Sequence, residues 1–61
     1  MKRKALVQHL STHNCQLLRE GKKHSVFYNP GNNKTSTLPR HREIDDFLAK
    51  KICCDLSIPE P

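Results

Sequence analysis

The sequence predicts a small α+β domain in which two helices cover one face of a three-stranded antiparallel sheet, in the order helix, strand, strand, strand, helix. Three observations support this prediction: a leucine pair at helical spacing near the start, three short strand-like runs separated by turn residues, and an apolar face repeating every three or four residues near the end. At 61 residues, the chain has room for one domain only. Residues 1–61 are therefore expected to form a single unit, with 57–61 as a short tail.

The first predicted element is a helix over residues 3–13. Leu6 and Leu10 are four positions apart and lie on one face, while Lys and Gln cover much of the rest. Asn14 is a plausible end of this helix, because asparagine tolerates the left-handed conformation that closes many helices.

Three predicted strands follow, over 15–20 ("CQLLRE"), 24–29 ("HSVFYN") and 34–38 ("KTSTL"). The middle run is the strongest, since it holds Val, Phe and Tyr together. Gly21 marks a short turn after the first strand, and "PGNN" marks a reversal after the second. Pro39 ends the third strand because proline has no N–H to donate to a neighbouring strand.

The last helix is predicted to begin near Glu43. Its start is acidic and its end is basic, the arrangement that a helix dipole favours: Glu43, Asp45 and Asp46 lie in the expected first turn, and Lys50 and Lys51 lie near the end. The prolines of "SIPEP" then stop the helix. The predicted core draws on every element: Leu6, Leu10, Leu17, Phe27 or Val26, Leu38, Ile44, Leu48 and Ile52.

Alternation along the second strand places His24, Val26 and Tyr28 on one face and Ser25, Phe27 and Asn29 on the other. If Phe27 is the core residue, His24 and Tyr28 face away from the helices together. A bulge in the sheet would change that count.

The charge balance favours an anionic macromolecule as partner. Eleven Lys and Arg against six Asp and Glu give a net charge of +5, which attracts nucleic acid or an anionic membrane. No apolar run approaches the roughly 20 residues of a spanning helix, so nucleic acid is the better expectation. So small a domain encloses no deep pocket, and this argues against a small-molecule substrate.

Cysteine and histidine usage predicts no metal and no cofactor. The three cysteines are odd in number and show no Cys-x2-Cys spacing, so neither a disulfide framework nor a zinc site is expected. Without a secretion signal, the expected compartment is the cytoplasm, where thiols pack as small apolar groups. His9 and His13 can share a helix face, but "HLSTH" lacks the glutamate of a zinc protease motif and a third ligand.

Several stretches taken together resemble the HicA-type (YcfA-like) messenger-RNA interferase toxins of bacterial type II toxin–antitoxin systems. They are the start "MKRKALVQHLSTHNCQLLREGKKHSVFYNP", the later "LPRHREI" and the final helix, over roughly residues 2–58. Each piece alone is short, and their joint order and spacing carries the resemblance. The chain departs from the family at Lys23, where small or polar residues are common, and at Asn14, where glycine is common.

The resemblance implies a fold like that of double-stranded-RNA-binding domains and an endoribonuclease that cleaves mRNA without a metal. It also implies one catalytic histidine at the start of the second strand, which is His24 here. A cognate HicB-type antitoxin is the implied protein partner, which binds the toxin and blocks access to that histidine.

RNA can be cut without metal because its own 2′-hydroxyl can attack the neighbouring phosphorus. A histidine can move the proton, and nearby cations can stabilise the charge that develops on the phosphate. Cations for that task are Lys22, Lys23 and Arg40, while His41 and Tyr28 are possible helpers. The residues expected to contact RNA are Lys22, Lys23, Tyr28, Lys34, Arg40 and His41.

Other functions remain open at this point. The same basic surface suits a non-catalytic module that binds double-stranded or structured RNA. For Tyr28, a half-buried strand aromatic is favoured over a base-stacking group. A protein that binds only an acidic partner protein is a third reading. RNA binding alone does not separate the first two, whereas cleavage does.

Overall fold

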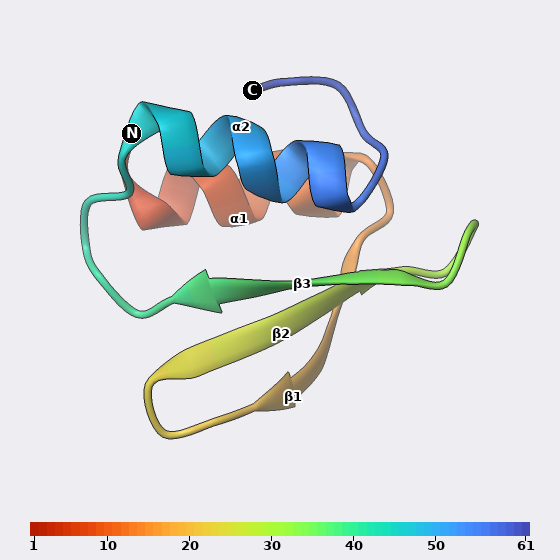
Figure 1. Ribbon diagram of the computed structural model, residues 1–61, viewed down its shortest axis with the longest axis horizontal. Helices are drawn as coiled ribbons and strands as arrows, with labels where there is room; N and C mark the ends of the chain where they lie inside the picture. The colour runs from red at the N-terminus through yellow and green to blue at the C-terminus, as the bar shows by residue number, and fades with distance from the viewer.

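The computed structural model of the protein, which describes residues 1–61, has the predicted α-β-β-β-α order (Figure 1). Its elements are α1 (Arg3–Thr12), β1 (Gln16–Glu20), β2 (His24–Asn29), β3 (Lys34–Pro39) and α2 (Asp46–Asp55). The strands form one antiparallel sheet in the order β1-β2-β3. The predicted fold class is thereby confirmed.

The register of β2 against β3 defines two ends of the sheet. His24 lies opposite Pro39 at one end, and Asn29 lies opposite Lys34 at the other. We call the first the His24 end, which also carries the β1–β2 turn, and the second the Lys34 end, which carries the β2–β3 turn. Because a strand rises about 3.3 Å per residue, the two ends are roughly 17 Å apart.

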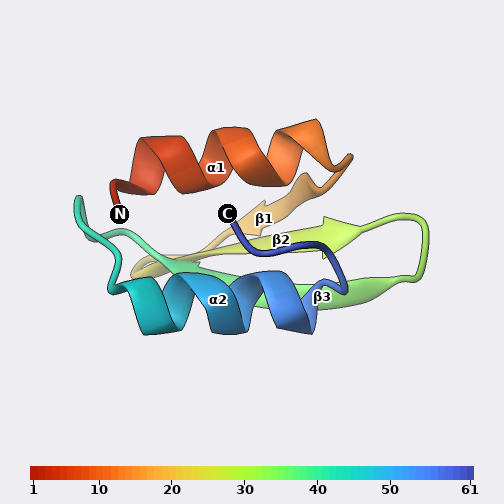
Figure 2. The same ribbon diagram turned by 90° about the horizontal axis from the view of Figure 1, so that it is seen from above.

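Both helices lie on one side of the sheet, with α1 and α2 next to each other (Figures 1 and 2). Between them and the sheet lies a single cluster of ten buried apolar residues: Leu6, Leu10, Cys15, Phe27, Leu38, Ile44, Ala49, Ile52, Cys53 and Leu56. Ser25 and Phe27 of β2 are buried while His24 is exposed and Val26 is half-buried, so His24 and Tyr28 do face away from the helices.

Strand β1 is left uncovered, and the prediction that Leu17 belongs to the core is wrong. All five residues of β1 are exposed, and Leu17 and Leu18 keep 48% and 53% of their surface accessible. In Figure 1, β1 is the strand farthest from the helices. The register also shifts between Leu17 and Arg19, where an extra residue makes a bulge. An edge strand beyond the helical layer cannot bury either face.

Helix α2 begins at Asp46, three residues later than predicted, because the segment before it is extended. The backbone N–H of Ile44 donates to Met1 O at 2.7 Å, and that of Arg3 donates to Arg42 O at 2.9 Å. Asp46 lies in the first turn as predicted and Asp45 is the N-cap residue, whereas Glu43 precedes the helix. No basic residue lies in the last turn, so the basic half of the predicted dipole arrangement is wrong.

The apolar face of α2 is also shifted from its prediction. Leu48 is only half-buried and Phe47 is 77% exposed, whereas Ala49 and Cys53 fill the core positions. Burial raises the pKa of the Cys53 thiol and likewise that of Cys15, which keeps both in the apolar thiol form. Cys54 is exposed.

The ends of the elements follow local backbone chemistry. Asn14 closes α1 with a φ of 66°, as predicted for a left-handed residue. Asn33 closes the β2–β3 turn with a φ of 59°. No helix has both the length and the apolar character needed to cross a membrane.

Candidate nucleic-acid interface

His24 is the first residue of β2, and its imidazole is exposed on the open rim of the sheet. Its ring makes no hydrogen bond within the protein, whereas its backbone pairs with Pro39 and Gly21. A free imidazole at an open rim can approach an extended polymer without a lid or a deep cleft. This accessibility is the first requirement for a proton-transfer group acting on RNA.

The turn before His24 is held by one short backbone contact. The N–H of Gly21 donates to the carbonyl oxygen of His24 at 2.7 Å, which closes the β1–β2 connection. A Cβ at position 21 would lie 3.0 Å from that same oxygen, closer than nearly all such contacts in proteins. Glycine therefore permits this close approach without displacing the His24 carbonyl. Lys22 and Lys23 form the exposed tip of this turn.

A series of side-chain hydrogen bonds joins the start of α1, the end of β1 and the end of β3 at the His24 end. The Arg3 guanidinium donates to Pro39 O at 3.1 Å and to Ser25 Oγ at 2.9 Å. Ser25 Oγ in turn donates to Glu20 Oε1 at 2.6 Å. Ser25 is fully buried, so both of its bonds are made in a protected setting and its hydroxyl is satisfied.

Arg40 extends this series of hydrogen bonds toward the solvent. It forms an ion pair with Glu20, and its guanidinium also donates to Gly21 O at 2.7 Å. A predicted phosphate-binding cation is thus engaged with a carboxylate in the free protein. Binding of a phosphate to Arg40 must then replace Glu20 as its partner, which is feasible because the pair is about half-exposed.

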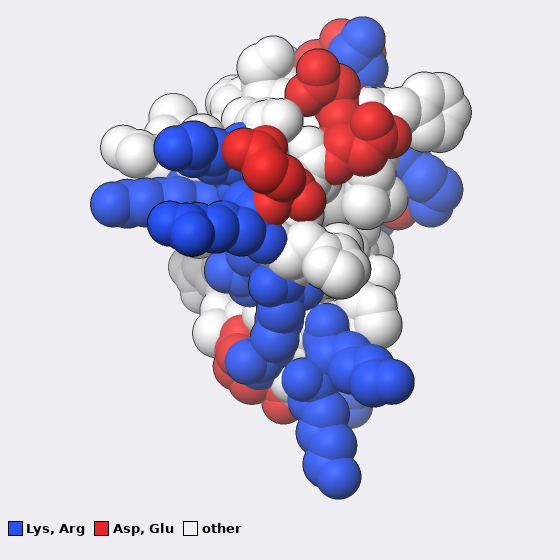
Figure 3. Space-filling model, turned by 90° about the vertical axis from the view of Figure 1, so that its left-hand side faces the viewer, with Lys and Arg blue, Asp and Glu red and all other residues white.

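Charge is unevenly distributed over this side of the molecule. Figure 3 shows Lys and Arg atoms over its lower and left-hand parts and most of its Asp and Glu atoms in a group above them. Lys22 and Lys23 have no ion-pair partner, and His41 is exposed immediately after Arg40. The structure therefore brings Lys22, Lys23, Arg40 and His41 to the same end of the sheet as His24.

Two predicted RNA contacts lie elsewhere. Lys34 belongs to the Lys34 end, where its Nζ donates to Ser57 Oγ at 3.0 Å. Tyr28 shares the outer face with His24 but lies four positions farther along β2, half-buried, with its hydroxyl donating to Gln16 Oε1 at 3.2 Å. Neither side chain can contact the same phosphate as His24.

The histidine pair of α1 does not form a metal site in this structure. The rings of His9 and His13 are 4.5 Å apart, but His9 Nε2 donates to Pro59 O at 2.8 Å and His13 Nδ1 donates to His9 O at 3.0 Å. No group of three or more potential ligands from His, Cys, Asp and Glu is close enough to hold a metal ion. The contact to Pro59 instead fastens the tail onto α1.

Sequence reasoning missed Arg3, Glu20 and Ser25 as parts of this end of the molecule. Arg3 lies in a run of basic residues at the start of α1, a pattern typical of a solvated surface, yet Arg3 is half-buried. The available signal was Ser25, a hydroxyl at an inward position of β2, which requires polar partners when buried. Which partners it finds depends on how α1 packs, and no local pattern reveals that.

Comparisons with protein-family models, with curated proteins and with solved structures find no match to this chain.

Proposed function

We propose that this protein is a metal-independent endoribonuclease, a toxin of the HicA type that cleaves mRNA through His24. The observation that carries the proposal is the position of His24: an unbonded imidazole on an open rim, with Lys22, Lys23 and Arg40 at the same end of the sheet. The resemblance of the sequence to HicA-type toxins agrees with this arrangement. The site requires no cofactor.

In this mechanism the 2′-hydroxyl of one nucleotide attacks the adjacent phosphorus, and the bond from phosphorus to the 5′-oxygen of the next nucleotide breaks. His24 accepts the proton of the 2′-hydroxyl or donates one to the leaving oxygen. Lys22 and Lys23, together with Arg40 once it leaves Glu20, stabilise the negative charge on the phosphate. His41, which follows Arg40 at the same end of the sheet, is the second histidine that we assign to the complementary proton transfer.

A protein partner fits the same surface. An open, basic rim offers no internal control of access, so inhibition requires a molecule that covers His24. An acidic antitoxin of the HicB type, acting in the cytoplasm, is the partner that we propose. The partner covers the basic rim and competes with mRNA for it.

Cleavage of a defined RNA in the presence of a chelator tests the proposal. We expect the native protein to cut and His24→Ala to lose about 10²- to 10⁴-fold in rate, the usual contribution of a general acid or base. His9→Ala is the matched control, because it removes a histidine from the far side of the domain. Equal cutting by the native and His24→Ala proteins would remove His24 from the mechanism.

The rival function is a module that binds structured RNA and does not cut it. It would give salt-dependent RNA binding and no cleavage by the native chain under any of these conditions. Growth arrest on induction, relieved by an acidic protein encoded next to the toxin, would separate the toxin from this module in cells.

A further inference from the structure

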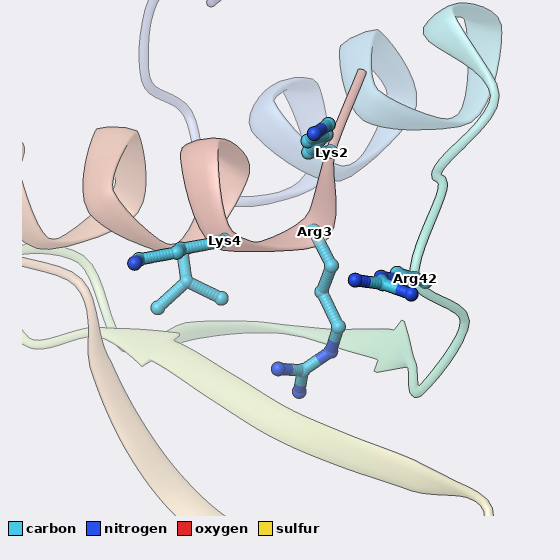
Figure 4. A pocket seen from close by; sticks show the side chains of 5 residues that line it. Lys2, Arg3, Lys4 and Arg42 are labelled. Atoms are coloured by element: carbon cyan, nitrogen blue, oxygen red, sulfur yellow. The ribbon is translucent and has the colours of Figure 1, made fainter.

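A second cationic feature lies beside the start of α1, apart from the His24 rim. It is an open depression of about 480 Å³, shown in Figure 4. Four of its five lining side chains are cationic and come from two segments that are distant in the sequence; the lining is Lys2, Arg3, Lys4, Val7 and Arg42. In Figure 4, Arg3 points down toward the sheet, with Lys4 on one side of it and Arg42 on the other. We call this the Arg42 pocket.

None of the four cations is neutralised by a carboxylate. The ion pairs of the protein involve the Met1 ammonium, Arg40 and Lys51 only. Glu43, the acid next to Arg42 in the sequence, pairs with the Met1 ammonium at 3.5 Å, as does Asp46 at 3.1 Å. The hydrogen bond to Asp46 raises the pKa of that ammonium, so it stays charged and keeps these acids occupied.

The assembly of the pocket is fixed by backbone pairing rather than by chance contact of long side chains. Lys2 and Glu43 form an antiparallel bridge, and the N–H of Arg3 donates to Arg42 O at 2.9 Å. Arg3 is further held by Pro39 O and Ser25 Oγ, both neutral acceptors. Like charges are therefore held together without a counterion, an arrangement that favours occupation by an anion.

Arg3 connects this pocket to the His24 rim. One of its acceptors, Pro39, lies opposite His24 in the sheet, and the other, Ser25, follows His24 in the chain. The pocket and the rim thus lie at the same end of the sheet, with Arg3 between them. A polymer that carries phosphates at regular intervals can occupy both at once.

We propose that the Arg42 pocket is a phosphate-binding subsite for the RNA backbone, one that holds a phosphate other than the one cleaved at His24. This inference rests on the proposed function and extends it to a footprint of several nucleotides. A subsite of this kind contributes affinity without reading sequence, because phosphate contacts position a nucleic acid and leave the bases unread. It also makes affinity depend on RNA length.

The test compares RNA binding by two charge-matched double variants, both made with His24→Ala so that the RNA stays intact. The pocket variant is Lys4→Gln with Arg42→Gln, which leaves Arg3 and its structural bonds in place. The control is Lys50→Gln with Lys51→Gln, which removes the same number of positive charges from α2. The probe is a single-stranded RNA of about 12 nucleotides with a 5′-hydroxyl terminus, so that only backbone phosphates are present.

For the pocket variant, we expect a loss of affinity on the order of tenfold and a salt slope that is smaller by about one, the result of losing one or two phosphate contacts. The control should change the slope much less. A dinucleotide, which cannot extend from the rim to the pocket, should bind both variants equally. Circular dichroism and melting curves establish that both variants fold.

Equal affinity and equal salt slope for the pocket and control variants would overturn the subsite. That outcome is separable from failure of the proposed function, which is judged by whether the chain with native His24 cuts RNA. If the native chain cuts RNA and the pocket variant binds RNA like the control, the proposed enzyme activity stands and the proposed subsite is rejected.

Discussion

The turns at the two ends of the sheet use their polar side chains in opposite ways. At the Lys34 end they are consumed by structure: the side-chain amides of Asn29 and Asn32 both donate to Leu56 O, at 2.9 and 3.3 Å, and Lys34 donates to Ser57. These bonds fasten the β2–β3 turn to the end of α2. At the His24 end, the ring of His24 and the ammonium groups of Lys22 and Lys23 make no such bond. Groups with no structural task are the ones available for a ligand.

The largest effect is expected at the His24 end, where a substitution should abolish most of the cleavage activity and leave the stability unchanged. His24→Ala should lower RNA cleavage by at least about a hundredfold while the free energy of unfolding stays within about 0.5 kcal/mol, because the lost side chain is exposed and unbonded. Urea denaturation alongside a cleavage assay measures both quantities. A marked fall in stability would mean that the ring has a structural role, and the contrast between the ends would then fail.

The reverse result is expected at the Lys34 end. Asn29→Ala removes the bond to Leu56 O and the acceptor for the N–H of Gly31, and should cost about 1–2 kcal/mol of unfolding free energy. Cleavage per folded molecule should not change. Urea denaturation gives the first quantity, and a cleavage assay well below the melting temperature gives the second. Loss of cleavage by a fully folded Asn29→Ala protein would contradict the assignment of a purely structural role to the Lys34 end.

A smaller effect should sharpen the description of the His24 end. Glu20→Gln keeps an acceptor for Ser25 but removes the charge that holds Arg40, so RNA affinity should rise by about two- to fivefold, in line with the value of an exposed ion pair. Glu60→Gln in the tail removes the same charge and serves as control. Fluorescence anisotropy with labelled RNA measures the difference. Weaker binding by Glu20→Gln would show that the pair positions Arg40 rather than restraining it.

The smallest effect on RNA affinity is expected from substituting a cation at the Lys34 end, away from His24. Lys34→Ala should change RNA affinity by less than about twofold, whereas Lys23→Ala at the turn next to His24 should weaken it several-fold and reduce the salt slope by about 0.7. Titrations at three salt concentrations suffice. If the two lysines behave alike, RNA covers the whole outer face and the two ends are not distinct.

The fold was largely predictable because each strand and turn is determined by neighbouring residues. The run from His24 to Asn29 is a strand with the predicted bounds, and Asn14 adopts the predicted left-handed conformation. Errors appeared where distant segments decide the outcome. The segment before Asp46 is extended because the chain start pairs with it, and Leu17 is exposed because the helices do not reach β1.

The candidate site was predictable only in part, for a similar reason. A histidine next to two lysines at a strand start is a local pattern, so Lys22, Lys23 and His24 could be grouped from the sequence. Arg40 and Glu20 are 20 positions apart, and Arg3 and Ser25 are 22 apart. Their meeting depends on sheet register and on how α1 packs. Lys34 lies at the opposite end from His24 because successive turns of an antiparallel sheet alternate between its two ends.

The pairing between the chain start and the segment before α2 has a kinetic consequence. The two hairpins join neighbouring strands, whereas the contact of Met1 with Ile44 joins residues 43 positions apart. Closing so long a loop costs more chain entropy than closing a hairpin, so we expect this pairing to form late in folding. The four cations of the Arg42 pocket therefore come together only near the native state. An anion bound there would act mainly by slowing unfolding, with little influence on the rate of folding.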